Sequence, residues 1–318
     1  MKIVILDAHA VNPGDLSWDC FNRFGDVTVY PYTVNSQTAD RIGDAQIVMT
    51  NKTHITEEIL DRCPNIRLIC VLATGYNAVD CEAARRRGIP VCNVPAYSTN
   101  AVAQFVFSLL LEICNGVGYH NQIVHQGKWS SQPHFCFWDT PQIELAGKTI
   151  GIIGFGRIGR AVGRIAKAMG MDVLAYNRSR CPEGEEIGKY VDLDTLLENA
   201  DVISLHSPLT DQTAGIINKE TLSKIKKGAI LLNTARGGLL NEEDVANALR
   251  TGHLSAAAVD VVSSEPVAPD NPLLSAPNCI ITPHMAWAPI QARQRILDCT
   301  VASIEGYLSG QYVNIVNE

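Results

Sequence analysis

The stretch KTIGIIGFGRIG, from Lys148 to Gly159, decides how the chain folds. An apolar run ending at Ile153 leads directly into the pattern Gly154-x-Gly156-x-x-Gly. Gly154 permits a tight turn, Gly156 lets the backbone approach a pyrophosphate, and the last glycine lets a helix pack closely on the strand. The amino end of that helix offers unpaired N–H groups and a positive dipole end to phosphates. The pattern predicts a dinucleotide site, although glycines that merely ease a strand-to-helix turn are the alternative. The residues expected at the phosphates are Gly154, Gly156, Arg157, Ile158 and Gly159.

The sequence after this turn repeats the same strand–helix pattern. The runs DVLAY, DVISLH, AILLNTA, AAAVDVV and CIITPH alternate with stretches of helical spacing as far as Pro283. Such alternation is typical of α/β domains built on a parallel sheet. We therefore expect one domain to contain the glycine turn and all of these runs.

The residues before the turn show a second, separate alternation. Runs that are apolar at consecutive positions predict strands covered on both faces of a sheet. The expected strands are Lys2–Leu6, Val27–Tyr30, Ile47–Met49, Ile66–Leu72 and Pro90–Cys92. Apolar residues at helical spacing predict two long helices, one from about Val102 to Val117 and one from about Pro289 to Leu308.

These patterns predict an α/β protein with two Rossmann-like or flavodoxin-like parallel-sheet domains, joined by two long interdomain helices. Because the long helices bracket the second alternation, residues 1–99 and 288–318 are expected to form a substrate-binding domain. Residues 100–287 are expected to form the dinucleotide-binding Rossmann domain.

The composition limits the class of protein. With 318 residues, 46% hydrophobic and 19% charged, the chain has room for two soluble globular domains. No apolar run reaches the roughly 18–20 residues of a membrane span, so no membrane partner is expected. The opening MKIVILDAHA is typical of a strand and not of an export signal, and the ten cysteines form no Cys-x-x-Cys pair. A net charge of −7 argues against a nucleic-acid partner. We expect a cytoplasmic protein with reduced thiols and no metal.

The stretch LAYNRSR, residues 174–180, lies where dinucleotide-binding chains usually place a lone acid beside the adenosine ribose. An acid there would bind both ribose hydroxyls of NAD and repel a 2′-phosphate. Here Asn177, Arg178 and Ser179 stand at this position, followed by Arg180. Guanidinium groups suit phosphate oxygens, so the loop favours NADP(H). In the alternative, both arginines are surface charges and Asn177 or Ser179 binds the ribose of NAD(H).

Three chemically active side chains each follow a predicted strand. Arg236 follows AILLNTA, Glu265 follows AAAVDVV, and His284 follows CIIT. Open α/β sheets bind ligands at the carboxyl ends of their strands, so these side chains are expected to converge. Taken singly, each has a structural alternative: an Arg paired with a surface acid, a Glu opening a turn, or a core His.

With these motifs in place, the chain resembles the D-isomer-specific 2-hydroxyacid dehydrogenase family over nearly all of its length. The resemblance rests on the GFGRIG turn, the HSPLT segment (206–210), NTARGG (233–238), the run from Asp260 to Glu265-Pro266, and Pro283-His284. It implies that Arg236 binds the substrate carboxylate, that His284 is the acid/base, and that Glu265 holds His284.

The resemblance also implies further binding residues. The ATGYN stretch matches the turn whose backbone N–H groups hold the carboxylate, which implies substrate contacts from Thr74, Gly75 and Tyr76. Asp260 is expected at the nicotinamide carboxamide, with capping of a loop as its alternative. The other residues expected to line the cofactor are His206, Pro208, Thr213, Thr234 and Ala235.

The chemistry agrees with these roles. Reduction of a 2-keto acid delivers hydride to the carbonyl carbon and leaves negative charge on the oxygen, which a proton donor and a cation stabilise. His284 can donate that proton, with Glu265 fixing its ring, while Arg236 can bind a carboxylate through two parallel hydrogen bonds. Because His284 must be protonated for reduction and neutral for oxidation, reduction is expected to be favoured at lower pH.

The ATGYN and PHMAWAP patterns are most similar to the hydroxypyruvate reductase/glycerate dehydrogenase branch. We therefore expect reversible reduction of a hydroxypyruvate- or glyoxylate-type 2-keto acid to the D-2-hydroxy acid with NAD(P)H. One alternative is another D-2-hydroxyacid dehydrogenase, of the D-lactate or phosphoglycerate type. The other is a non-catalytic, NAD-sensing binding protein similar to corepressors.

Three features are left with open roles. Trp287 either caps the substrate end of the site or anchors the last helix in the core. Gln104 stands where family members often carry Glu, and the sequence gives no reason for the difference. The long aromatic stretch from Trp129 to Leu145 is poorly explained as a connector, and since family members are usually dimers, we expect it to contribute to a homodimer.

Overall fold

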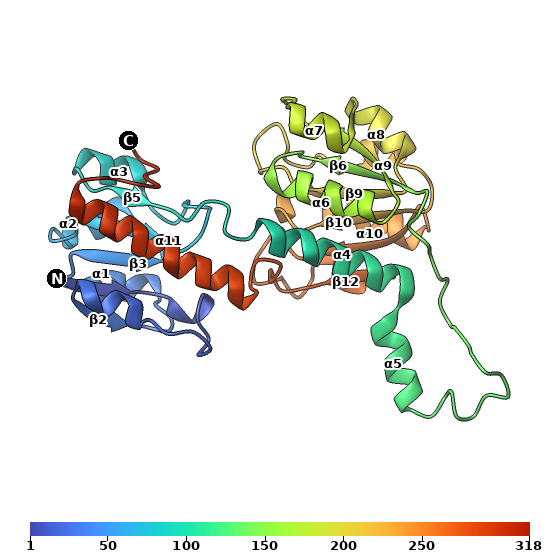
Figure 1. Ribbon diagram of the computed structural model, residues 1–318, viewed down its shortest axis with the longest axis horizontal. Helices are drawn as coiled ribbons and strands as arrows, with labels where there is room; N and C mark the ends of the chain where they lie inside the picture. Colours follow the sequence, from blue (N-terminus) through green and yellow to red (C-terminus); the bar gives the residue numbers. More distant parts are fainter. The chain divides into compact units, whose positions relative to one another are not determined.

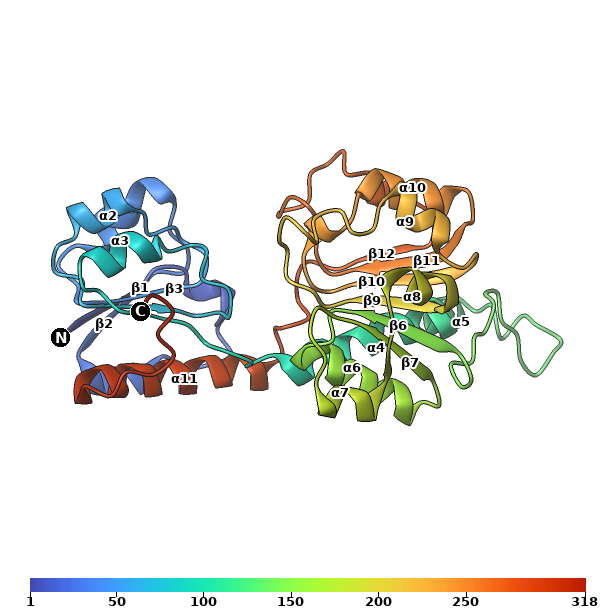
Figure 2. The same ribbon diagram turned by 90° about the horizontal axis from the view of Figure 1, so that it is seen from above.

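The computed structural model describes all 318 residues, and the chain folds as two compact units. Unit 1 consists of Met1–Ser98 with Trp287–Glu318, and unit 2 consists of Thr99–Ala286. Each unit contains one sheet in which all neighbouring strands run parallel (Figures 1 and 2). The predicted fold class, two parallel-sheet α/β domains with long helices, is confirmed.

Unit 1 is built on a five-stranded sheet with the order β2-β1-β3-β4-β5. Its strands are β1 (Lys2–Ile5), β2 (Asp26–Val29), β3 (Ile47–Thr50), β4 (Leu68–Val71) and β5 (Val91–Cys92). Its α-helices are α1 (Thr38–Ile42), α2 (Glu57–Arg62), α3 (Cys81–Arg86) and α11 (Ile290–Ser309), and its 3-10 helices are η1 (Ala8–Ala10), η2 (Asp19–Phe24) and η3 (Asn35–Gln37).

The consecutive apolar residues of these strands pack into two different cores of unit 1. In β1, Val4 packs into the core shared with α1, α2 and α3, whereas Ile3 and Ile5 pack into the core shared with η2 and α11. Figure 2 shows α2 and α3 on one face of the sheet and α11 on the other. Both faces are therefore covered, as the strand pattern predicts.

Unit 2 is built on a seven-stranded sheet with the order β12-β11-β10-β9-β6-β7-β8. Its strands are β6 (Thr149–Ile153), β7 (Asp172–Tyr176), β8 (Lys189–Tyr190), β9 (Val202–Leu205), β10 (Ala229–Asn233), β11 (Leu254–Val259) and β12 (Cys279–Ile281). Its helices are α4 (Thr99–Asn115), α5 (Val117–His125), α6 (Arg157–Ala168), α7 (Pro182–Ile187), α8 (Leu193–Asn199), α9 (Lys219–Lys224) and α10 (Glu242–Arg250), with 3-10 turns η4 (Gly237–Leu239) and η5 (Pro272–Ser275).

The strand order of unit 2 changes direction at β6, which lies in the middle of the sheet between β9 and β7. Helices α4, α6 and α7 cover one face, and α8, α9 and α10 cover the other (Figure 2). Open α/β sheets bind ligands beyond the carboxyl ends of the strands where the order reverses. The glycine turn that follows β6 stands at this position.

The first long helix ends two residues before the position that its apolar spacing predicts. The structure ends α4 at Asn115 and begins α5 at Val117, with the two axes bent by 55°. Gly116 between them adopts the left-handed conformation, with a φ of 55°, which glycine takes without steric cost. No single helix is long and apolar enough to span a membrane, although the bent α4–α5 pair meets that test by length and composition.

Candidate active site

The glycine turn joins β6 to α6. Gly154 has a φ of 94°, and a Cβ there would overlap the backbone of Ser207, so only glycine fits between the two loops. A Cβ on Gly159 would overlap the carbonyl oxygen of Gly154, whereas a Cβ on Gly156 would stand in open space. The backbone at Gly156 therefore faces an open region beside the amino end of the 12-residue helix α6, which begins at Arg157 and continues through Ile158. This arrangement fits a pyrophosphate.

The ribose loop, residues 177–180, is tied to the glycine turn by Asn177. The Asn177 Oδ1 accepts a hydrogen bond from the Phe155 N–H at 3.2 Å, and its Nδ2 donates to the Ser179 carbonyl at 2.7 Å. Arg178 makes no hydrogen bond or ion pair, whereas the guanidinium of Arg180 lies over the Tyr190 ring, 5.7 Å from its centroid. Asn177 is thus engaged within the loop, and Arg178 is the cation left free for a ligand.

The loop after β9 flanks the glycine turn on its other side. The Nε2 of His206 lies 2.8 Å from the hydroxyl of the buried Ser204, and burial lowers the pKa of His206 to about 3. A ring that is neutral at ordinary pH does not serve as the acid of the site. Further along the loop, the Thr213 hydroxyl donates to the Pro208 carbonyl at 2.7 Å and closes the turn.

Arg236 is presented by a turn that Asn233 holds at the end of β10. The fully buried Asn233 side chain accepts from the Ala235 N–H at 3.0 Å and donates to the Arg236 carbonyl at 2.9 Å. The Arg236 side chain is exposed, donates only to the Ala235 carbonyl within the chain, and makes no ion pair. In the same turn, the Thr234 hydroxyl is buried without a hydrogen-bond partner. Such an orphaned group, at the same edge of the sheet as the glycine turn, fits a bound cofactor.

The loops after β10 and β11 lie against each other, because a Cβ on Gly237 would overlap the backbone of Val262. This contact brings the turn of Arg236 next to the segment that carries Glu265. The Glu265 Oε2 lies 2.7 Å from the Nδ1 of His284, and the two side chains are 39% and 31% exposed. The acid and the imidazole are thus paired while remaining open to a ligand.

His284 is held in an unusual backbone conformation by Asp260. His284 has a φ of 52°, and its N–H donates to the Asp260 carbonyl at 2.8 Å. The buried Asp260 carboxylate accepts from the Met285 and Ala286 N–H groups at 2.9 and 2.8 Å and from the Thr282 hydroxyl at 2.6 Å. All of its hydrogen bonds in the chain serve the loop of His284, which is the capping role, and a nicotinamide contact stays a prediction.

The ATGYN turn, residues 73–77, belongs to unit 1 and follows β4. The Thr74 hydroxyl donates to the Val94 carbonyl at 2.8 Å, and Asn93 donates to the Thr74 carbonyl at 2.8 Å. The backbone N–H groups of Thr74, Gly75 and Tyr76 donate to no acceptor in the chain. Three unpaired donors on one turn suit a carboxylate.

The two features with open roles at the sequence level have clear positions. Trp287 packs against the core under α11 in unit 1 and meets Tyr97 edge to face, with ring centroids 6.2 Å apart, which agrees with a core anchor. Gln104 is exposed on α4 and lines an apolar groove of about 570 Å³ with Phe107 and with Ile165 of α6. Nothing in the structure explains why Gln replaces Glu there.

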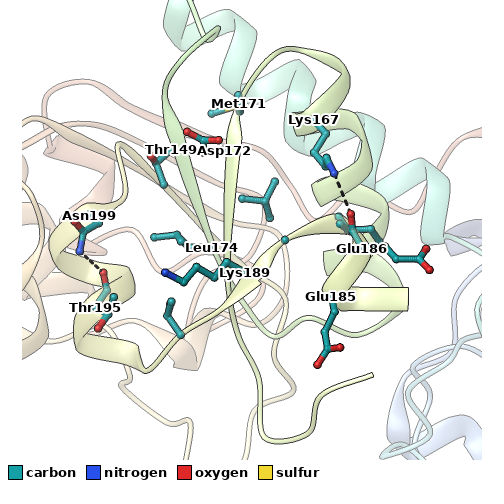
Figure 3. A pocket seen from close by; sticks show the side chains of 14 residues that line it. Thr149, Lys167, Met171, Asp172, Leu174, Glu185, Glu186, Lys189, Thr195 and Asn199 are labelled. Atoms are coloured by element: carbon teal, nitrogen blue, oxygen red, sulfur yellow. Dashed lines mark hydrogen bonds between the residues drawn. The ribbon is translucent and has the colours of Figure 1, made fainter. Parts of the chain in front are cut away.

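A larger hollow of about 620 Å³ lies at the amino ends of the strands in unit 2, opposite the edge that carries the glycine turn. Figure 3 shows that it is lined by residues that begin strands, such as Thr149, Asp172 and Lys189, and by Glu185 of α7. None of the residues predicted for the site contributes to it. Its mixed charges are exposed, and the candidate site at the carboxyl edge does not depend on it.

Sequence reasoning missed the residues that support the site. Asn233 and Ser204 are buried polar residues in otherwise apolar strands, and each holds a predicted site residue. The sequence signal for these residues was a polar residue inside an apolar strand run. Such a residue is buried and needs a hydrogen-bond partner, which indicates a supporting role.

A glycine turn suited to pyrophosphate, an orphaned hydroxyl, a free arginine and a His–Glu pair at one sheet edge define a dinucleotide-dependent oxidoreductase. Comparison with known proteins is more specific. The model of the "D-isomer specific 2-hydroxyacid dehydrogenase, NAD binding domain" matches residues 107–286. The chain belongs to the D-isomer-specific 2-hydroxyacid dehydrogenase family, as the sequence motifs predict.

Individual relatives agree with this assignment. The chain is 53% identical to a hydroxypyruvate reductase of Blautia hydrogenotrophica over 322 residues, which covers 100% of both chains. It is 37% identical to a glycerate dehydrogenase of Methylorubrum extorquens, over 99% of this chain and 98% of the relative. Among solved structures, an acyclic imino acid reductase in complex with NADPH and D-Arg has a TM-score of 0.84 at 29% identity, covering 99% of this chain and 100% of its own. The predicted branch, glycerate dehydrogenase/hydroxypyruvate reductase, is confirmed.

Proposed function

We propose that the chain reduces a small 2-keto acid of the hydroxypyruvate or glyoxylate type to the D-2-hydroxy acid, reversibly, with NAD(P)H. The observation that carries the proposal is the 2.7 Å pair between the His284 Nδ1 and the Glu265 Oε2. The other ring nitrogen, Nε2, makes no hydrogen bond in the chain and is available for proton transfer to a ligand. The names of the hydroxypyruvate reductase and glycerate dehydrogenase relatives support the substrate class.

The mechanism assigns one task to each side chain. Glu265 accepts from the Nδ1–H of His284, which fixes the tautomer and the orientation of the ring. The Nε2–H of His284 donates a proton to the carbonyl oxygen of the keto acid as negative charge develops there. Arg236 binds the substrate carboxylate through its exposed guanidinium. In unit 1, the unpaired N–H groups of the ATGYN turn are donors suited to a substrate carboxylate.

The residues that would hold the cofactor are those of the glycine turn, Gly154 to Gly159, the ribose loop and Thr234. The turn suits the pyrophosphate, and the orphaned Thr234 hydroxyl offers a hydrogen bond. When bound, the reduced nicotinamide supplies the hydride. The chain positions the acceptor carbonyl, and because burial lowers the pKa of His206 to about 3, that ring is neutral and does not act as a second acid.

We infer that the cofactor is NADP(H), with NAD(H) as the alternative. Arg178 is an unpaired cation on the ribose loop, where a 2′-phosphate would lie, and no acid stands beside it to repel that phosphate. The side chain of Asn177 is already engaged with Phe155 and Ser179, which weakens the alternative in which it binds a ribose hydroxyl.

We also propose that the chain forms a homodimer and acts in the cytoplasm. The arm formed by α5 and residues 126–145 projects away from the sheet of unit 2 (Figure 1), and it exposes Trp129, Phe135 and Trp138 by 50%, 89% and 65%. Aromatic side chains exposed to this extent are typical of contact surfaces. All ten cysteines are free thiols, which suits a reducing compartment.

The test of the proposed function is direct. Oxidation of NADH and of NADPH is followed with hydroxypyruvate, glyoxylate and pyruvate, at several pH values, and the reverse reaction with D-glycerate. We expect turnover with hydroxypyruvate and glyoxylate, with reduction favoured at lower pH and oxidation at higher pH. The variant His284→Gln is expected to lose about 100- to 10,000-fold in kcat. Binding of the cofactor without turnover of any keto acid would instead support the corepressor-like binding protein.

A further inference from the structure

A buried carboxylate organises one loop at the carboxyl edge of the sheet in unit 1. Asp7 follows β1 and is 6% exposed. It accepts hydrogen bonds from three successive backbone N–H groups beyond β3, those of Asn51 at 2.7 Å, Lys52 at 2.5 Å and Thr53 at 2.8 Å. Asp7 makes no ion pair, so these donors are what compensates its buried charge. The backbone at Lys52 is therefore fixed by a neighbouring strand.

This loop lies beside the ATGYN turn. The Asn51 side chain donates to the Leu72 carbonyl at 2.8 Å, just before the turn. The Ile55 N–H donates to the Ala78 carbonyl at 2.8 Å, just after the turn. These two hydrogen bonds join the loop after β3, which carries Lys52, to the turn after β4, which carries the unpaired N–H donors. The two loops are therefore adjacent within unit 1.

Lys52 is the free cation of this loop. Its side chain is exposed and makes no ion pair or hydrogen bond, whereas Lys2, the other lysine of unit 1, pairs with Asp44 at 2.6 Å. The loops directly after the five strands, residues 6–10, 30–33, 51–55, 72–78 and 93–97, contain a single acid, Asp7, and its oxygens are already used. The edge thus offers positive charge without a competing carboxylate.

We propose that Lys52 determines substrate specificity by donating to the oxygen on C3 of the keto acid, and that Asp7 is the positioning residue that fixes Lys52. The proposal rests on the proposed function, in which the ATGYN turn holds the substrate carboxylate. A substrate whose carboxylate is held by the ATGYN turn presents its C3 end to a neighbouring loop. The ammonium group of Lys52 has three N–H donors, one of which can bind a hydroxyl oxygen. Lys52 therefore selects 2-keto acids that carry oxygen on C3 over those that carry only hydrogen.

The experiment compares Lys52→Met with wild type on hydroxypyruvate, pyruvate and glyoxylate. Hydroxypyruvate and pyruvate differ only by the C3 hydroxyl, and glyoxylate has no third carbon. We expect kcat/KM for hydroxypyruvate to fall by about 10- to 100-fold, as for loss of a charged hydrogen bond, while pyruvate and glyoxylate are unaffected. Lys52→Arg, which keeps the charge, should retain part of the preference. The matched control is Lys2→Met, since Lys2 begins β1 at the opposite edge of the same sheet, and it should change none of the three values.

Asp7→Asn tests the positioning role. We expect it to lower kcat/KM for hydroxypyruvate selectively, and to add nothing further in the double variant with Lys52→Met, because both changes act through one contact. Additive losses would overturn the role of Asp7. Equal losses on all three substrates in Lys52→Met, or no loss, would overturn the role of Lys52. If the proposed function itself is wrong, wild type reduces no keto acid, and that outcome differs from all of these results. If Asp7→Asn does not fold, the Lys52 variants still test the proposal.

Discussion

Arg178 is the residue on which the proposed preference for NADP(H) rests. We predict that Arg178→Asp shifts the preference toward NADH, because a carboxylate at that position repels a 2′-phosphate and binds ribose hydroxyls. The ratio of kcat/KM for NADPH to that for NADH should fall at least about tenfold. Steady-state kinetics with both cofactors measures this ratio.

The matched control for this change is Arg67→Asp, since Arg67 is also exposed and unpaired but belongs to unit 1. It makes the same change in net charge and should leave the ratio as it is in wild type. NADPH use that is unaltered in Arg178→Asp would refute the phosphate contact and favour the alternative in which NAD(H) is the cofactor.

His206 makes folding stability depend on pH. Its ring binds a proton near pH 6.5 when unfolded, but burial in the folded chain lowers its pKa to about 3. The unfolded state therefore binds more protons between these values, so the contribution of His206 to stability is complete above about pH 6.5 and is lost as the pH falls toward 3. Urea unfolding of wild type and of His206→Asn between pH 4 and 7.5 should show a steeper loss for wild type. Parallel curves for the two proteins would contradict this account.

At the scale of single elements, Asp260 connects the end of β11 to the loop that carries His284. We predict that Asp260→Asn lowers kcat, because an amide cannot accept all of the hydrogen bonds from Thr282, Met285 and Ala286 that hold the His284 backbone at positive φ. Loss of a buried charged hydrogen bond should also lower the free energy of unfolding by about 1.5–3 kcal/mol. Kinetics and chemical unfolding of the same sample measure both effects.

The control is Asp201→Asn. Asp201 accepts from the Thr149 N–H at 2.9 Å and pairs with Lys226, at the other edge of the same sheet. This variant should lose stability but keep kcat. If Asp260→Asn keeps kcat as well, the loop does not need Asp260 to present His284.

The elements that could be predicted from sequence are those specified by local patterns. Apolar runs located the strands, and the glycine spacing located the turn after β6, because backbone conformation and burial are written into neighbouring residues. The break at Gly116 was missed, since the apolar spacing continues across it and only the left-handed backbone marks the bend.

The reactive side chains of the candidate site could be proposed from the sequence. The residues that hold the loops of these side chains were harder to predict. The placement of Arg236, Glu265 and His284 on loops at one edge follows from strand ends meeting at that edge of a parallel sheet. The use of Asn177 to tie its own loop to Phe155, and of Asp260 to hold the loop of His284, depends on partners distant in sequence. A single sequence does not specify which of several polar groups a side chain will contact.

At the scale of the whole molecule, the aromatic arm of unit 2 is the feature on which the proposed homodimer rests. We predict that the chain is a dimer and that replacing Phe135 and Trp138 by serine shifts it to monomer, because both side chains lie largely exposed in the single chain. Sedimentation equilibrium of wild type and variant measures the mass. A double variant at Tyr32 and Tyr312, which are exposed on unit 1, is the control and should remain dimeric. A monomeric wild type would contradict the proposal.

The order in which the chain leaves the ribosome has a consequence for unit 1. Unit 2 is continuous from Thr99 to Ala286, whereas unit 1 needs α11, whose Ile296, Leu297 and Ile304 cover one face of its sheet. The strands of unit 1, which are synthesised first, therefore keep an uncovered apolar face until the last helix has been synthesised. During that time this face can aggregate or bind chaperones. Nascent chains stalled so that residues 1–286 have left the ribosome while α11 is still inside it should accordingly contain a protease-resistant second unit and a protease-sensitive first one.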